Sequence, residues 1–193
     1  MTAAVIYIHG FLSSPQSLKA QQLGEFVAAQ YSDVEYIVPG LANNPGEACQ
    51  QVDQLVQDCL QRYPGSLGLV GSSLGGFLAT VMAERYDLPA VLINPAVAPH
   101  NFAEHFIGDH RNPYTGVDFS LGQADIDALR GMAVSPTARR YWVLVQEADE
   151  ILDYRRALDF YQASKLTVEA GGDHSFQGFD RYLPAVMDFL QLD

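Results

Sequence analysis

The feature that most limits what this chain can fold into is a turn rich in glycine and serine between an apolar strand and an apolar helix. Residues 67–70 form the apolar run, the helical stretch begins at Phe77, and the turn between them reads Gly71-Ser72-Ser73-Leu74-Gly75-Gly76. Glycines two before and two after a serine permit the close backbone approach of a sharp strand-to-helix turn. This spacing predicts that the hydroxyl of Ser73 projects above the end of a sheet.

Ser72 is the alternative reactive serine in the same turn. Val70 stands two residues before it, where the pattern requires glycine, so the spacing favours Ser73. A helix that begins directly after the turn points its N–H groups and its positive dipole end at negative charge developing on a bound oxygen. A strand before the turn and a helix after it are the context expected of a nucleophilic serine.

Strand and helix patterns alternate along most of the chain. The runs predicted to be strands are residues 3–8, 34–38, 67–70, 89–93, 141–145 and 166–169. The predicted helices are residues 17–30, the segment from Asn44 to the stop at Tyr63-Pro64-Gly65, and residues 77–86, 153–163 and 179–190. This alternation predicts an α/β fold with a doubly wound, mainly parallel six-stranded sheet.

Composition limits the partners and the location of the protein. A chain of 193 residues fits a single domain, residues 1–193. The net charge of −12 argues against nucleic acid and anionic membranes as partners. Cys49 and Cys59 lie ten residues apart in one predicted helix, too far apart to form a disulfide bond with each other. We therefore expect a cytoplasmic protein.

Five polar residues directly follow predicted strands, namely His9, Ser73, Asn94, Asp149 and His174. Ligands bind at the carboxyl ends of the strands in such sheets. A serine hydroxyl becomes a nucleophile when an imidazole takes its proton, and a carboxylate orients that imidazole. Ser73, Asp149 and His174 have the chain order of such a triad on a strand-to-helix elbow.

More than one acidic residue in this part of the sequence could supply the carboxylate of the triad. Glu147, Asp149, Glu150 and Asp153 fall within seven residues. Asp149 is favoured because it lies four residues past the predicted strand end, which leaves room for a turn to bring it back over the sheet. Asp153 is the next candidate, although Asp153 and Glu150 could instead cap the following helix.

Two main-chain N–H groups are expected to bind the oxyanion of the reaction. One belongs to Leu74, the residue after the nucleophile, and the other to the loop after the first strand. In that loop His9-Gly10-Phe11 places the N–H of Phe11 at the required position, with Gly10 permitting the turn. We expect His9 to brace this loop through hydrogen bonds rather than to act as the base.

Seven short segments together carry a family resemblance that runs nearly end to end. They are Tyr7-Ile8-His9-Gly10-Phe11, Ser13-Ser14-Pro15, Val70-Gly71-Ser72-Ser73-Leu74-Gly75-Gly76, Asn94-Pro95-Ala96-Val97, Asn112-Pro113-Tyr114-Thr115-Gly116, Asp149-Glu150-Ile151-Leu152-Asp153-Tyr154-Arg155 and Gly171-Gly172-Asp173-His174. By these segments the chain resembles an α/β-hydrolase, and within that superfamily the small YqiA-like esterase family.

The resemblance implies a serine esterase or acyl thioesterase that needs no cofactor and no metal. It places the triad on Ser73, Asp149 and His174. The chain departs from the family in one respect, because relatives commonly have glycine two residues before the acid, where this chain has Glu147. That departure keeps Asp153 open as the alternative acid.

The resemblance also turns residues 97–140 into a short helical and loop cap inserted over the site. Phe102, Phe106 and Tyr114 offer apolar surface for an acyl group, although each could equally pack against the sheet. Because the cap is short, small to medium acyl chains are expected. Four arginines could bind an anionic leaving group such as coenzyme A, namely Arg111, Arg130, Arg139 and Arg140.

The expected partner is therefore a small-molecule acyl ester or thioester, with acyl-coenzyme A among the possible substrates. Two other functions fit the same residues. An acyltransferase would use the same triad to pass the acyl group to an alcohol or thiol. A non-catalytic binding module could retain the scaffold without the reaction, because a fold does not determine a function.

Overall fold

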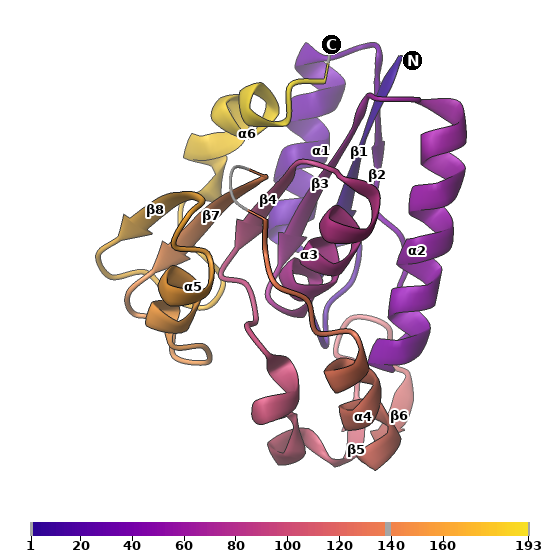
Figure 1. The fold of residues 1–193 in the computed structure, drawn as a ribbon, viewed down its shortest axis with the longest axis vertical. Helices are drawn as coiled ribbons and strands as arrows, with labels where there is room; N and C mark the ends of the chain where they lie inside the picture. Colours follow the sequence, from indigo (N-terminus) through magenta and orange to yellow (C-terminus); the bar gives the residue numbers. More distant parts are fainter. Residues whose placement is uncertain (1, 138–139, 193) are drawn as a thin grey trace.

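The computed structural model describes residues 2–137 and 140–192, and its centre is one sheet of six parallel strands (Figure 1). The strand order is β2-β1-β3-β4-β7-β8. The bounds are β1 Ala3–Ile8, β2 Val34–Ile37, β3 Leu67–Ser72, β4 Ala90–Ile93, β7 Tyr141–Gln146 and β8 Lys165–Glu169. The predicted doubly wound, parallel α/β sheet is confirmed.

Helices cover both faces of this sheet. On one face α1 (Leu18–Gln30) and α6 (Leu183–Leu190) share a core with the sheet. On the other face lie α2 (Pro45–Arg62), α3 (Leu74–Tyr86) and α5 (Tyr154–Phe160). Every residue of β1, β3, β4 and β7 is buried, which is why these strands are predominantly apolar in the sequence.

The direction of winding reverses between β1 and β3. From β1 the chain passes to β2 at one edge of the sheet, and from β3 it proceeds to β4, β7 and β8 at the other edge. β1 and β3 are hydrogen-bonded neighbours, with Ile8 opposite Gly71 at their carboxyl ends. Loops that leave adjacent strands in opposite directions open a crevice between them, where ligands bind in α/β sheets.

Residues 97–131 lie beyond this carboxyl edge, at the end of the molecule opposite both chain termini, and the chain then returns along the sheet to the start of β7 (Figure 1). They contain two 3₁₀ turns (Pro99–Asn101 and Ala103–Phe106), the hairpin of β5 (Gly108–Arg111) and β6 (Asp118–Leu121), and α4 (Gln123–Gly131). The helical pieces were expected from the sequence. The hairpin was not, because β5 reads Gly-Asp-His-Arg and has no apolar residue that would indicate a strand.

Three of the predicted helices differ at their ends. α3 begins at Leu74 instead of at residue 77. α5 stops at Phe160 instead of continuing to residue 163. The last predicted helix begins as a 3₁₀ turn, Phe179–Tyr182, and becomes α-helical only at Leu183, directly before Pro184. Cys49 and Cys59 are unpaired and buried in α2. Among the described residues no helix combines the length and the apolar character needed to cross a membrane.

Close backbone contact fixes α3 against the sheet. A Cβ atom built on Gly75 would lie less than 3.0 Å from the main-chain oxygens of Ile8 and His9, at the end of β1. A Cβ atom on Gly71 would lie 2.8 Å from the side chain of Ala79. Real Cβ atoms essentially never approach so closely, so these two glycines are required by packing rather than by their backbone angles.

Replacing Gly75 with alanine tests this contact. We expect Gly75→Ala to lower the free energy of unfolding by about 3 kcal/mol or more, because neither the strand nor the first turn of α3 can retreat from the added methyl group. Gly131→Ala is the matched control, since nothing lies within 4 Å of its Cβ position at the end of α4. That variant is expected to change stability by less than about 1 kcal/mol. Urea denaturation measures the free energy of unfolding of both variants, and equal values would contradict the packing argument.

Candidate active site

Ser73 occupies the turn between β3 and α3 in a backbone conformation that serines seldom adopt. Its φ is 57° and its ψ is −122°, which places a non-glycine residue at positive φ. The main chain of Ser73 is held there because its N–H donates to the carbonyl of Ile93 at 3.0 Å and its carbonyl accepts from the N–H of Gly76 at 2.9 Å. Strain of this kind persists only where the surroundings determine it, and it is common at functional sites.

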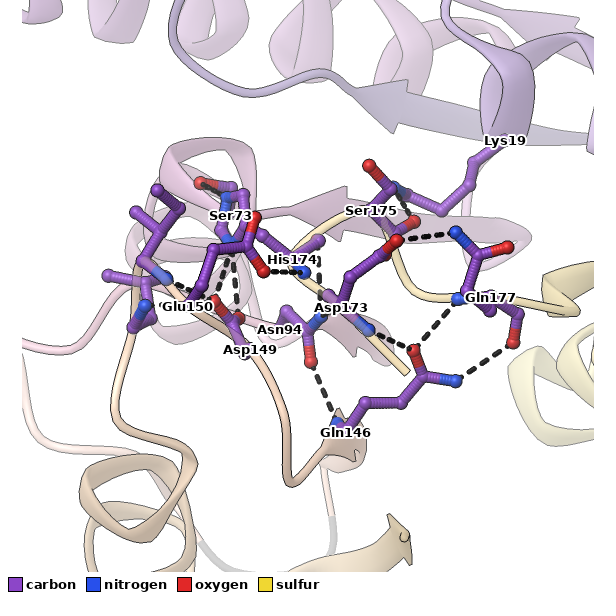
Figure 2. A network of polar contacts seen from close by, with 12 residues as sticks. Lys19, Ser73, Asn94, Gln146, Asp149, Glu150, Asp173, His174, Ser175 and Gln177 are labelled. Carbon is purple, nitrogen blue, oxygen red and sulfur yellow. Dashed lines mark hydrogen bonds and ion pairs between the residues drawn. The ribbon is translucent and has the colours of Figure 1, made fainter. Parts of the chain in front are cut away.

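The structure brings Ser73, His174 and Asp149 together in one hydrogen-bonded line (Figure 2). The Nε2 atom of His174 lies 3.0 Å from the hydroxyl of Ser73. The Nδ1 atom of His174 lies 2.9 Å from each carboxylate oxygen of Asp149. The side chain of Asp149 is 2% exposed and that of His174 is 22% exposed, so the carboxylate is shielded while the imidazole reaches solvent.

Main-chain donors hold the carboxylate of Asp149 in place. Its Oδ1 atom accepts hydrogen bonds from the N–H groups of Ile151 at 2.9 Å and Leu152 at 2.8 Å. Asp153, the alternative acid, caps α5 by accepting from the N–H of Arg155 at 3.1 Å and forms an ion pair with the same arginine. The arrangement therefore separates the two aspartates, one facing the imidazole and the other serving the helix.

A buried amide pair supports the loop that carries His174 (Figure 2). The side-chain amide of Asn94, after β4, donates to the carbonyls of Asp173 at 3.0 Å and His174 at 3.1 Å. Its oxygen accepts from the N–H of Gln146 at 3.0 Å. Asn94 is 2% exposed, so these bonds form away from water, where leaving them unmade is costly.

Gln146, at the end of β7, holds both sides of the same loop. Its side-chain oxygen accepts from the N–H groups of Asp173 at 3.1 Å and Gln177 at 2.8 Å. Its amide nitrogen donates to Glu169 at 2.7 Å and to the carbonyl of Gln177 at 2.8 Å. Gly172 has a φ of +75°, and a Cβ atom there would overlap the Gln146 amide. Gln146 is not predictable from the sequence, because as the last residue of an apolar strand it resembles an ordinary strand end.

The main-chain N–H groups of Phe11 and Leu74 lie on the two loops expected to supply oxyanion donors. Within the described residues neither group donates to a protein acceptor. Leu74 is the first residue of α3, so its N–H has no partner inside the helix. A Cβ atom at Gly10 would be 3.1 Å from both the carbonyl oxygen of Ser72 and the Cβ atom of Ser73, so the Phe11 loop runs directly beside the serine.

His9 belongs to this loop and not to the hydrogen-bonded line. Its side chain is 6% exposed, and its Nδ1 atom contacts the carbonyl of Gly10 at 3.0 Å. Burial lowers the pKa of His9 below its ordinary value, because removal from water disfavours the charged ring. A neutral imidazole bonded to its own loop matches the bracing role expected from the sequence.

An apolar cleft of about 250 Å³ opens beside Ser73 and His174. Phe102 and Phe106 line it, together with Leu121 and Leu129 from the segment beyond the sheet edge. Tyr114 does not line this cleft and is 54% exposed. The structure therefore places two of the three expected substrate-contacting aromatics at the apolar cleft, and Tyr114 elsewhere.

The cap segment is tied to the site through the buried amide of Asn112. This side chain, 3% exposed, donates to the carbonyl of Ser13 at 3.2 Å and to Asn43 at 3.0 Å. Its oxygen accepts from the N–H of Tyr114 at 3.0 Å. The ring of Phe11 packs edge-on against Phe106, His110 and Phe119, with centroid distances of 5.6 to 5.8 Å. The β5–β6 hairpin is thereby anchored to the loop that carries the Phe11 N–H.

The arginines expected to bind an anionic leaving group lie in neither the apolar cleft nor the line of Ser73. Arg111 and Arg130 are exposed and pair with Asp118 at 3.6 Å and Asp127 at 2.8 Å. Arg140 precedes β7, at the amino edge of the sheet opposite the site, and pairs with Asp87. Arg139 lies outside the described residues. The expectation is therefore wrong for Arg140, whereas for Arg111 and Arg130 it stays a prediction.

Solved structures of similar architecture define the class of the fold. The alpha/beta hydrolase domain-containing protein 10 from mouse aligns with a TM-score of 0.74 and 20% identity, covering 97% of this chain and 89% of that chain. An esterase domain from a Rhodothermus marinus protein has a TM-score of 0.70 and 14% identity, with coverages of 95% and 83%. The thioesterase domain from the curacin biosynthetic pathway has a TM-score of 0.64 and 14% identity, with coverages of 96% and 91%. The chain has the α/β-hydrolase fold.

A family model gives the finer assignment. The model of the uncharacterised protein family UPF0227 matches residues 4–191. The chain belongs to this family, and the match extends over the sheet, the segment beyond its edge and all the loops described above.

The amide of Gln146 gives a test of how the His174 loop is held. We expect Gln146→Leu to lower the free energy of unfolding by about 2–3 kcal/mol, because the N–H groups of Asp173 and Gln177 lose their acceptor without gaining water. Gln54→Leu is the matched control, since Gln54 is exposed on α2 and bonds only Asp58. The control is expected to stay within about 0.5 kcal/mol of the parent. If urea denaturation gave both variants the parent stability, the loop would not depend on this amide.

Proposed function

We propose that the protein is a serine hydrolase that cleaves carboxylic esters or acyl thioesters through an acyl-enzyme on Ser73. The observation that carries the proposal is the hydrogen-bonded line from the Ser73 hydroxyl through His174 to the shielded carboxylate of Asp149. It is supported by the family fold, which an esterase domain and a thioesterase domain share. The donors for the oxyanion in this proposal are the N–H groups of Phe11 and Leu74.

The geometry supports a specific course of proton transfer. The Ser73 hydroxyl donates its proton to Nε2 of His174 as its oxygen attacks the carbonyl carbon. The Nδ1–H of His174 donates to Asp149, whose negative charge stabilises the imidazolium that forms. His174 then gives the proton to the leaving oxygen or sulfur. In the second half of the reaction His174 activates a water molecule, which releases the acid and restores the serine.

The acyl group is assigned to the apolar cleft. Its lining is almost entirely hydrocarbon, with Ser73 and His174 at one end. Burial of each methylene of an acyl chain contributes about 0.8 kcal/mol, so the cleft favours longer chains until its volume is filled. A volume of about 250 Å³ supports small to medium acyl groups, as expected from a short cap.

Replacing the nucleophile is the direct test. Ser73→Ala is expected to lower kcat for p-nitrophenyl butanoate by about 10⁶ while the protein keeps its fold, because the residual rate depends on binding and the oxyanion donors alone. Ser72→Ala, one residue earlier, serves as the control and is expected to retain activity. A fluorophosphonate probe should label the parent protein and Ser72→Ala but not Ser73→Ala. Activity of Ser73→Ala at the parent rate would remove Ser73 from the mechanism.

The two candidate acids are separated by a pair of amide substitutions. Asp149→Asn is expected to lower kcat by about 10⁴, because the amide cannot hold the imidazole in the required tautomer or stabilise its charge. Asp153→Asn removes an acid that caps α5 and pairs with Arg155 but does not contact His174, so its kcat is expected to stay near the parent value. Ester hydrolysis by the two purified variants gives the answer. A large loss in Asp153→Asn with an active Asp149→Asn would reverse the assignment.

A further inference from the structure

A second cleft, of about 380 Å³, also reaches Ser73 and His174. It lies on the side of α1 and differs from the apolar cleft in the chemistry of its lining. Its lining mixes apolar side chains, among them Phe11 and Leu18, with polar ones: Ser13, Ser17, Lys19, Gln22, Tyr114 and Gln177. A carbonyl carbon bound at Ser73 would therefore have hydrocarbon on one side and a mixed surface that includes one ammonium group on the other.

Lys19 is the distinctive group of this second cleft. Its ammonium donates to the carbonyl of Ser175 at 2.6 Å, which places it beside the His174 loop (Figure 2). The ion pairs of the described residues involve arginines and His174, but not Lys19. An ammonium has three N–H donors, so this contact leaves donors available. Burial lowers the pKa of Lys19 to about 8, against the opposing charges of Asp173 and Asp149.

No other lysine or arginine lines either cleft within the described residues. The second lysine of the chain, Lys165, lies on β8 at the edge of the sheet, with its ammonium 3.7 Å from the centre of the Trp142 ring. Asp173 contributes negative charge near Lys19 but is not part of the cleft lining, and its Oδ2 atom accepts from the side chain of Gln177. In a chain of net charge −12, a cation with free donors in a cleft that also reaches the nucleophile is a local exception.

We propose that the second cleft binds the leaving group of the ester or thioester, and that Lys19 selects leaving groups that carry an anionic group, a carboxylate or a phosphate. The inference rests on the proposed function and names its substrate class. As the bond from the Ser73 oxygen to the carbonyl carbon forms, the bond from that carbon to the leaving oxygen or sulfur breaks. His174 returns the serine proton to the leaving atom. The leaving group departs as an alcohol or thiol whose distant anion faces the ammonium.

A pair of esters with one acyl group isolates the effect of charge. The parent protein is compared on 4-carboxyphenyl butanoate and on its neutral methyl ester, 4-(methoxycarbonyl)phenyl butanoate. We expect Lys19→Met to lower the ratio of kcat/KM for the anionic over the neutral ester by about tenfold to a hundredfold, the range of a charge-assisted hydrogen bond. Any loss from the broken contact with Ser175 affects both esters and cancels in the ratio.

Two further variants serve as matched controls. Lys19→Arg retains the positive charge and is expected to retain most of the ratio. Lys165→Met removes the other lysine and the same unit of charge at a distance from the site, so its ratio is expected to equal that of the parent. A 4-phosphonophenyl ester completes the series, because the anionic ester with the larger dependence on Lys19 identifies carboxylate or phosphate as the preferred group.

A binding measurement keeps the subsite separate from the reaction. In the Ser73→Ala background, calorimetric titration with 4-carboxyphenyl butanoate should show affinity that falls about tenfold or more when Lys19→Met is added. If the parent protein hydrolysed neither ester and the Ser73→Ala background still showed this fall in affinity, the proposed function would be refuted and the anion subsite would stand. Equal losses on both esters in Lys19→Met, with unchanged binding of the anionic ester, would overturn the subsite and leave Lys19 only as a support for Ser175.

Discussion

The whole site depends on how closely α3 approaches the end of β1. Gly75 brings the first turn of the helix against the main chain of Ile8 and His9 at a separation that no side chain could share. The turn before the helix carries Ser73, and the loop after β1 carries Phe11, so this single contact sets the position of the hydroxyl and of both candidate oxyanion donors. Because β1 and β3 are the strands between which the winding reverses, the contact also lies where the sheet opens a crevice.

Buried amides extend this rigid centre to the loops after the other strands. Asn94 after β4 and Gln146 at the end of β7 bond the main chain on both sides of His174, so two neighbouring strands contribute to the placement of one imidazole. Hydrogen bonds require short distances and near-linear angles. They can therefore fix the orientation of the His174 ring, whose two nitrogens must face different partners. The acid loop and the imidazole loop are also bonded to each other, because the N–H of Ala148 donates to the carbonyl of Gly171 at 3.0 Å.

Much of this was predictable from local patterns, and the remainder depends on contacts between distant segments. The strands were visible because burial on both faces demands continuous apolar runs, and Ser73 was visible because glycine spacing records a steric need. Gln146 carried no such signal, since its importance comes from the loop around Asp173. The β5–β6 hairpin was missed because its partly exposed strands lack an apolar period, and Arg140 was misplaced because a residue before a strand lies at the opposite edge from one after it.

The anchoring of the hairpin has a consequence for how substrate range can change in this family. The side chain of Asn112 hydrogen-bonds the carbonyl of Ser13. The ring of Phe11 packs edge-on against Phe106 and Phe119 of the cap segment. The hairpin, which lines the apolar cleft through Leu121, and the loop that carries the candidate donor Phe11 are thus held together. Shifting the hairpin to widen the cleft would therefore also displace the Phe11 loop. New specificities are therefore expected to arise by exchange of side chains within the cleft, with the hairpin backbone left in place.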